Sequence, residues 1–240
     1  MPRDYFEAWI SKMHALNTLQ ESDIAAIRKL PTRSVEITSG TTIISEGQLV
    51  SECCILLEGF ACRSKLNREG GRQIVSFHMA GDMLDIQHLL FDKADHNVEA
   101  ISAATVVFFP MADLRKIVDD NSGIAKALWR DCLVDASIFR EWVLNVGRRD
   151  AKSRVAHMLC EFAARREAAG LGSPERFDLP MTQEQIGDAT GLTAVHVNRM
   201  LRQLEEEGVF ERNGRNVRIS DWAQMKRVAE FDDGYLHLAA

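Results

Sequence analysis

The side chains best suited to chemistry gather between residues 179 and 219, in a pattern that favours two short helices joined by a tight turn. Thr182 and Gln185 have the spacing of a capping box, which predicts that a helix begins there. Gly191 allows a sharp turn, and Thr193 is a favourable N-cap for a second helix. The run is therefore predicted to form a helix-turn-helix, a motif that places its second helix in the major groove of DNA.

The second of these helices is predicted to have one buried and one exposed face. Val197, Leu201 and Leu204 are spaced for burial. This spacing turns outward Val195, Asn198, Arg199 and Arg202. Gly208 is expected to end the helix, and two short strands follow around Asn213-Gly214, the strongest short-range hairpin signal. The whole run predicts a winged helix-turn-helix.

The outward side chains have the chemistry for reading DNA. A guanidinium can bridge O6 and N7 of guanine, so Arg199 is expected to read a guanine. Asn198 or His196 could read an adjacent purine, and Val195 could rest on a thymine methyl group. Expected phosphate contacts, which give affinity without sequence information, are Thr182, Thr193, Arg202, Arg215 and Arg218. An ordinary pair of antiparallel helices is the alternative, but the capping box, turn glycine, arginines and wing together favour DNA binding.

The charge distribution agrees with a DNA-binding segment near the C-terminus. The whole chain has a formal net charge of −6, which by itself argues against a nucleic-acid partner. Residues 148–227, however, hold 14 Lys and Arg against 12 Asp and Glu, whereas residues 1–147 hold 15 against 20. The basic residues of 148–227 are mostly arginines, the side chain suited to bidentate contacts with phosphate and guanine. This asymmetry indicates two functions in one chain.

Composition limits the remaining classes of protein. With 240 residues, 46% hydrophobic and 27% charged, the chain can form one large or two small globular domains. It has no run of 18 apolar residues, so we expect no membrane span and no membrane partner. The N-terminal residues lack the apolar core of a secretory signal, and the five cysteines are expected to be reduced thiols. These features predict a cytoplasmic protein.

The N-terminal half has a different character. Apolar residues at helical spacing over residues 4–30 are followed, over 34–110, by short β-rich runs separated by glycines. Such runs predict an antiparallel β-roll or barrel. The expected domains are a sensor domain with N-terminal helices over 1–120, a dimerisation helix over 121–147, a winged helix-turn-helix over 148–222 and a helical tail over 223–240.

One long helix is predicted over residues 121–147, because neither proline nor glycine interrupts the span from 124 to 146. A heptad-like seam with alternating spacings of four and three contains Ile124, Leu128, Cys132, Phe139, Trp142 and Val146, with Asp135 as its one polar residue. Such a seam suggests pairing with a second copy of the chain. The alternative is a helix that packs across its own β-roll.

The predicted β-roll, the long helix, and Thr182, Gly191 and Arg199 with the following wing resemble the cyclic-AMP receptor and fumarate–nitrate regulator (Crp/Fnr) family of bacterial transcription factors. The resemblance covers about residues 20–222. It implies an α+β fold with a cyclic-nucleotide-binding-like roll (a jelly roll), and a non-enzymatic homodimer on a palindromic DNA operator. The resemblance is also compatible with RNA polymerase as a partner, although the sequence identifies no surface for that contact. By the same likeness Arg199 falls on the base-reading arginine, whereas Ala194 and Val195 replace frequent charged readers, so the operator is expected to differ.

The family likeness also bears on the effector. In cyclic-nucleotide-binding members, a Gly-Glu pair contacts the ribose and an Arg-Ser or Arg-Thr pair contacts the phosphate, just after a Gly-Asp turn. Here Gly81-Asp82 is followed by neither that Glu nor, as far as Val98, any Arg, and Asp92 and Asp95 would repel a phosphate. An iron–sulfur sensor needs an N-terminal cysteine cluster, yet the first cysteine is Cys53. Neither a cyclic nucleotide nor an iron–sulfur cluster is therefore expected.

The effector pocket is expected near the Gly-Asp turn, at Asp82, Asp85 and His88. Two alternatives use the same segment. A haem-binding sensor of this family would use a histidine after the turn as iron ligand, and in one type also an N-terminal proline, roles open to His88 and Pro2. A metal-binding sensor, or a cupin-like metal-dependent enzyme, would draw on Asp82, Asp85, His88, Asp92, Asp95 and His96. No regular two-histidine spacing is present, so we expect a polar loop with no resident metal or other cofactor.

Overall fold

The computed structural model describes residues 4–238, which divide into two compact units; Pro2 lies outside the described residues. The first unit comprises residues 4–65 and 77–136, and the second comprises residues 66–76 and 137–238. Two side chains of residues 66–76 make hydrogen bonds within the second unit. Arg72 Nε donates to Asp188 Oδ2 at 2.7 Å, and Gln73 Nε2 donates to the carbonyl oxygen of Ala189 at 3.2 Å. Within the described residues, no helix is long and apolar enough to cross a membrane.

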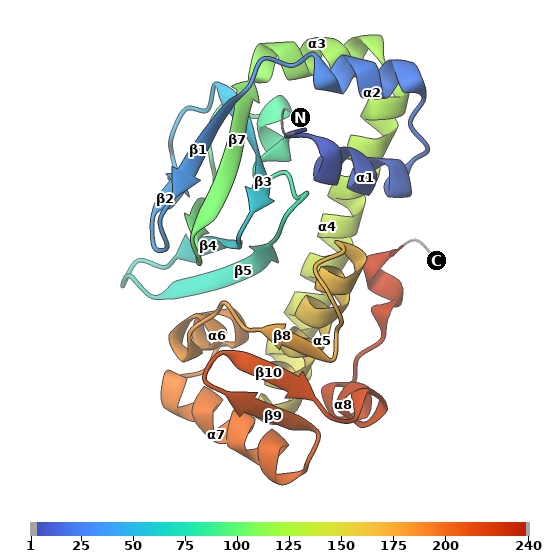
Figure 1. The fold of residues 1–240 in the computed structure, drawn as a ribbon. Helices are drawn as coiled ribbons and strands as arrows, with labels where there is room; N and C mark the ends of the chain where they lie inside the picture. The colour runs from blue at the N-terminus through green and yellow to red at the C-terminus, as the bar shows by residue number, and fades with distance from the viewer. Residues whose placement is uncertain (1–3, 239–240) are drawn as a thin grey trace. The chain divides into compact units, whose positions relative to one another are not determined.

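Residues 33–110 form a β-roll of two antiparallel sheets (Figure 1), and all of it belongs to the first unit except residues 66–76. One sheet has the strand order β1-β7-β3 and the other β2-β6-β4-β5. The strands are β1 (Arg33–Ile37), β2 (Thr42–Ile44), β3 (Glu52–Glu58), β4 (Ala61–Leu66), β5 (Arg72–His78), β6 (Asn97–Ala100) and β7 (Ala104–Pro110). Buried side chains such as Cys54, Leu84 and Val106 form one core cluster of the roll. The predicted roll is confirmed.

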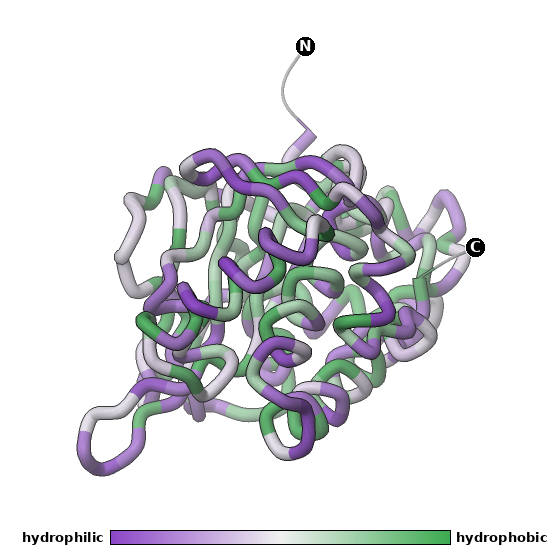
Figure 2. Tube along the Cα trace, turned by 90° about the horizontal axis from the view of Figure 1, so that it is seen from below, coloured by the Kyte–Doolittle hydropathy of each residue, from purple (hydrophilic) through white to green (hydrophobic). Residues whose placement is uncertain are grey.

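Helices cover one side of this roll (Figure 1). They are α1 (Glu7–Leu16), α2 (Glu21–Arg28), α3 (Met111–Asp120) and the short 3-10 helix η1 (Ile86–Leu89). Trp9 and Met13 of α1 and Ile27 of α2 are fully buried against the three-stranded sheet, where the rings of Trp9 and Phe109 lie 5.9 Å apart. In Figure 2 hydrophobic and hydrophilic residues alternate along the helices, as expected when one face of each is buried.

The predicted long helix is α4 (Ser122–Arg148), with 27 residues. Three members of the predicted seam are covered by the chain itself and are therefore not free to meet a second copy. Ile124 and Leu128 belong to the core beside α1 and α2. Trp142 is buried, and its indole Nε1 donates to both carboxylate oxygens of Glu161 at 3.0 and 2.9 Å. Of the others, Cys132 is exposed, and Phe139 and Val146 are half-buried.

The exposed apolar face of α4 lies one residue further along the heptad. We call this row the exposed stripe; its members are Trp129, Leu133, the half-buried Ala136, Arg140 and Val143, spaced four, three, four and three residues apart. The side chains of Trp129, Leu133 and Val143 are 70, 58 and 70% exposed. Large apolar side chains are rarely left uncovered in such a row, which suggests an interface.

The polar residue of the predicted seam has a partner inside the roll. Asp135 Oδ2 accepts a hydrogen bond from Nη1 of Arg63, a β4 residue whose side chain is only 5% exposed. Arg63 also donates to the carbonyl oxygen of Leu84 at 3.1 and 3.2 Å, just after the Gly81-Asp82 turn. Burial opposes ionisation of Asp135, but Arg63 prevails and lowers the pKa of that carboxyl. Asp135 therefore joins α4 to the roll instead of facing a second copy.

The second unit contains the C-terminal half of α4, a helical core and a small sheet of order β8-β10-β9. Its other elements are α5 (Ala151–Ala168), β8 (Arg176–Asp178), α6 (Gln183–Thr190), α7 (Ala194–Glu206), β9 (Phe210–Asn213), β10 (Asn216–Ile219), α8 (Trp222–Ala229) and η2 (Asp233–Leu236). Strand β8 is not among the strands predicted from the sequence.

The C-terminal tail packs against α5, through the buried side chain of His157. His157 Nδ1 lies 3.2 Å from the carbonyl oxygen of Ala229, and Nε2 lies 3.1 Å from the hydroxyl of Tyr235. Burial, reinforced by the nearby Arg149 guanidinium, lowers the pKa of His157 to about 4. The imidazole is therefore neutral at pH 7, as expected for a ring that fastens the tail.

Candidate DNA-binding surface and sensor pocket

Helices α6 and α7 form the predicted helix-turn-helix. The Thr182 hydroxyl accepts from the amide of Gln185 at 3.2 Å, and Gln185 Oε1 accepts from the amide of Thr182 at 2.9 Å, which completes the capping box. Gly191 ends α6 in the left-handed region with φ 68°, and Thr193 caps α7 through the amide of His196. Gly187 is a requirement that the sequence pattern did not reveal, because a Cβ there would lie 2.4 Å from the oxygen of Leu192.

Helix α7 presents its first two turns as the predicted reading face. Val195 is 82% exposed and Arg199 is also exposed, whereas Val197, Leu201 and Leu204 are buried. His196 and Asn198 are half-buried, and Arg202 is exposed further along the helix. Neither Arg199 nor Arg202 makes a side-chain hydrogen bond or ion pair with any residue in the range 4–238. Their guanidinium groups are therefore available to a ligand.

The wing is the β9–β10 hairpin, which turns at Gly214 with φ 63°. Arg215 at the turn is exposed. Arg218 on β10 is also exposed, but its guanidinium lies 3.6 Å from Glu211 Oε2, so a phosphate would have to compete with that carboxylate. Arg212, which sequence reasoning did not single out, points back to α7 and donates to Asn198 Oδ1 at 2.8 Å.

In the roll, the three residues expected at the effector pocket divide into two sites. Asp82 stabilises its own turn and the packing of α1: it accepts from the amide of Met79 at 3.0 Å and from Lys12 Nζ at 2.8 Å. Asp85 and His88 are fully buried, with Asp85 Oδ2 3.7 Å from His88 Nδ1. Asp85 Oδ2 and both ring nitrogens of His88 have no hydrogen-bond partner among the described residues.

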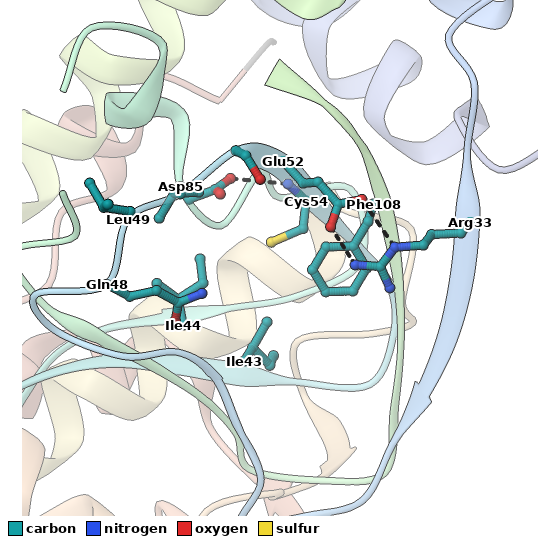
Figure 3. A pocket seen from close by; sticks show the side chains of 11 residues that line it. Arg33, Ile43, Ile44, Gln48, Leu49, Glu52, Cys54, Asp85 and Phe108 are labelled. Carbon is teal, nitrogen blue, oxygen red and sulfur yellow. Dashed lines mark hydrogen bonds and ion pairs between the residues drawn. The ribbon is translucent and has the colours of Figure 1, made fainter. Parts of the chain in front are cut away.

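Asp85 also lines a pocket of about 200 Å³ at the edge of the roll (Figure 3). Its walls come from β1, β2, β3, β7 and the loop before β3, and include Ile43, Ile44 and Cys54. At the mouth, the Arg33 guanidinium pairs with Glu52 and lies 4.1 Å from the centre of the Phe108 ring. Asp85 is held at the wall by the amide of Cys54, which donates to Oδ1 at 3.1 Å.

Comparison with known proteins finds a matching domain family for each half of the chain. Residues 153–228 match the Crp-like helix-turn-helix domain, and residues 34–121 match the cyclic nucleotide-binding domain. The nitrogen fixation regulation protein FixK of Bradyrhizobium diazoefficiens is 29% identical over 197 residues, which are 82% of each chain. The chain is a transcriptional regulator of the Crp/Fnr family.

Other relatives agree with this membership. The fumarate and nitrate reduction regulatory protein of Vibrio cholerae is 24% identical, over 92% of this chain and 88% of that protein. The solved structure of FixK2 from Bradyrhizobium japonicum superposes with a TM-score of 0.76 at 26% identity, and the match covers 83% of this chain and 98% of that one. The Crp/Fnr regulator is thus an α+β protein with a cyclic-nucleotide-binding-type roll, a winged helix-turn-helix that binds DNA, and no enzymatic role.

The metal site of the cupin-like alternative does not form. Within residues 4–238, no three His, Cys, Asp or Glu side chains gather in a way that could hold a metal ion. His96 is tied to Asp95 at 2.6 Å, and Asp82 is used by Lys12 and by its own turn. The six potential ligands are therefore dispersed over separate contacts.

The cysteines of this Crp/Fnr regulator are mostly core residues. Cys53, Cys54, Cys62 and Cys160 are buried, and Cys132 on α4 is exposed. Burial raises the pKa of the Cys53 and Cys54 thiols. They are therefore protonated near neutral pH, and a protonated thiol is a poor metal ligand and a poor nucleophile.

Proposed function

We propose that this regulator binds, as a homodimer, a two-fold symmetric operator, and that α7 of each subunit reads one half-site. The observation that carries the proposal is the unpaired, exposed Arg199 beside the exposed Val195 on the first turns of α7. A recognition helix contacts base edges with its N-terminal residues, so both side chains are in the right part of the helix. The place of action would be the cytoplasm, where the operator lies.

The test of this function begins with selection of operator DNA from random duplexes at near-physiological salt. We expect a palindrome with half-sites about one helical turn apart and a guanine in each. Arg199→Ala is then expected to lose about 1–3 kcal/mol on that site, or roughly 5- to 150-fold in Kd, and to relax specificity at one base pair. Gln203→Ala, an exposed change on the same helix, is the matched control. Equal losses on random DNA would refute the reading role of Arg199.

A separate prediction concerns the wing. Arg215 is exposed at the hairpin turn, where we propose that it contacts a phosphate. Arg215→Ala is expected to weaken binding to all sequences alike and to make the plot of log Kd against log salt shallower by about one unit. Titrations at four salt concentrations, on operator and on random DNA, measure both effects. An unchanged salt slope would exclude the phosphate contact.

We propose that the exposed stripe of α4 is the dimer interface. Its heptad spacing suits pairing of two copies about a two-fold axis, and a palindromic operator requires such an axis. Arg140 is the one charged member of the stripe, and polar residues at single seam positions specify register.

For the sensor, we propose that the pocket beside Asp85 receives the effector. Its volume of about 200 Å³ restricts it to a small molecule. The pocket presents the Asp85 carboxyl group and no unpaired cation to a phosphate, because the Arg33 guanidinium is held by Glu52, so a cyclic nucleotide is a poor fit. A thermal-shift experiment with cyclic AMP and cyclic GMP is expected to give no stabilisation; a rise in Tm would reverse this view.

A further inference from the structure

Three elements of the second unit meet at the side chain of Asn198. Arg212 of β9 donates from Nη2 to Asn198 Oδ1 at 2.8 Å. Gln183 of α6 donates from Nε2 to the same oxygen at 3.4 Å. Arg212 is itself held by Glu205 of α7, whose Oε1 accepts from the guanidinium Nε at 3.0 Å. The Asn198 amide is therefore fixed by the wing and by both helices of the helix-turn-helix.

These contacts fix which end of the amide is available. An asparagine side chain has one carbonyl oxygen, which accepts, and one NH2 group, which donates twice, whereas arginine can only donate. Arg212 must therefore face the oxygen. No described residue accepts a hydrogen bond from Asn198 Nδ2, and Asn198 lies beside the exposed Arg199 and one turn after Val195. The unpaired group on the reading face is a donor.

The two ends of the amide read different bases. A bidentate contact with adenine needs the oxygen to accept from N6 and the NH2 group to donate to N7. With its oxygen already held, Asn198 offers donors alone. Donors alone fit both acceptors of guanine, O6 and N7, and the O4 acceptor of thymine, whereas on adenine they meet N7 beside the N6 group, which is itself a donor.

We propose that Arg212 is a specificity-determining positioning residue: it holds the oxygen of Asn198, so that Asn198 selects guanine or thymine rather than adenine. This inference rests on the proposed function, because it assigns a base preference within the same operator. The competing explanation is that Arg212 only braces the wing against α7. A brace affects affinity for all operators equally, whereas a positioning residue changes the preference at one base pair.

The experiment measures relative affinities for the selected operator and for every single-base variant of one half-site. The proteins are the full-length wild type, Arg212→Ala, Asn198→Ala and the double variant. For the wild type we expect guanine or thymine next to the guanine read by Arg199. In Arg212→Ala the oxygen keeps only the 3.4 Å contact with Gln183, and the base preference at that position is expected to shift toward adenine by at least about fivefold, within the range of one good base contact. In the Asn198→Ala background, the additional loss of Arg212 is expected to leave the base preference at this base pair unchanged.

Two further variants serve as controls for this interpretation. Arg218→Ala removes a wing arginine that pairs with Glu211 instead of Asn198, so base preference is expected to persist. Arg212→Lys keeps a donor at this position and is expected to retain part of the wild-type preference, which also covers the case that Arg212→Ala fails to fold. Equal preferences in the wild type and both Arg212 variants, or a wild-type preference for adenine, would overturn the inference. A wild type that enriches no sequence would instead refute the proposed function and this inference with it.

Discussion

Leu133→Asp is expected to separate the two subunits and to weaken operator binding by more than about 100-fold. Leu133 is at the middle of the exposed stripe, with its side chain 58% exposed in one subunit. In a two-fold pair of α4 helices, the substitution would bury two like charges beside each other without partners. A dimer binds its second half-site intramolecularly, a gain of about 10²–10⁴ in avidity that a monomer loses.

Sedimentation velocity and anisotropy titrations with the selected operator measure the two consequences. Ala112→Asp is the matched control, because it adds the same charge at an exposed position of α3. The control is expected to remain dimeric with wild-type affinity. If Leu133→Asp remains dimeric and binds normally, the interface lies elsewhere than the exposed stripe.

The long helix illustrates what periodicity can and cannot predict. The sequence correctly predicts one helix of about 27 residues with heptad spacing. It could not decide which of two adjacent apolar rows faces the chain's own core, because both rows have the same period. Ile124 and Leu128 are buried by the roll unit itself, and Asp135 is explained only by Arg63, which is 72 residues away in sequence. The predicted row therefore differs from the exposed one by one residue.

The helix-turn-helix was predictable because its signals are local. The capping box, the left-handed Gly191 and the Gly214 turn each depend on a few neighbouring residues. The contact between Arg212 and Asn198 was not predictable, since it joins the wing to α7 across 14 residues. Strand β8 was missed for a similar reason, because its three residues are recognisable as a strand only through pairing with β10.

The sensor domain was the least predictable part at the level of single residues. Asp82, Asp85 and His88 are close in sequence, yet Asp82 contacts α1 whereas Asp85 and His88 are buried together. A pattern of polar residues after a turn is typical of a surface loop, and it does not reveal that a 3-10 helix carries His88 inward. The pocket at Asp85 is built from strands far apart in the chain, so its lining could only come from the fold.

Two buried histidines are expected to make the protein lose stability in mild acid. Burial, together with the nearby Arg63 guanidinium, lowers the pKa of His78 to about 4, and the pKa of His157 is also about 4. Both values lie below the ordinary value of 6.5, so between pH 6.5 and 4 the unfolded chain binds more protons than the native one. Stability therefore falls with falling pH, and each histidine is expected to contribute a loss of about 2 kcal/mol between pH 7 and pH 5.

Other groups change the total without reversing its sign. Burial lowers the pKa of His96 and adds to the loss, whereas burial raises the pKa of Glu161 and opposes it. Urea unfolding at pH 7 and pH 5, at one protein concentration, measures the combined effect. His157→Gln is expected to reduce the difference between the two pH values by about 2 kcal/mol, whatever it does to stability at pH 7.

The control is His237→Gln, because His237 is exposed. This variant is expected to show the same difference in unfolding free energy between pH 7 and pH 5 as the wild type. His78→Gln tests the roll in the same way that His157→Gln tests the DNA-binding unit. If the free energy of unfolding of His157→Gln changes between pH 7 and pH 5 by as much as that of the wild type, the imidazole of His157 titrates normally in the native state. The tail is then not fastened to α5 through a neutral His157. A loss that disappears only with His157→Gln would place the acid-sensitive contact at the tail, next to the helices that carry the reading face.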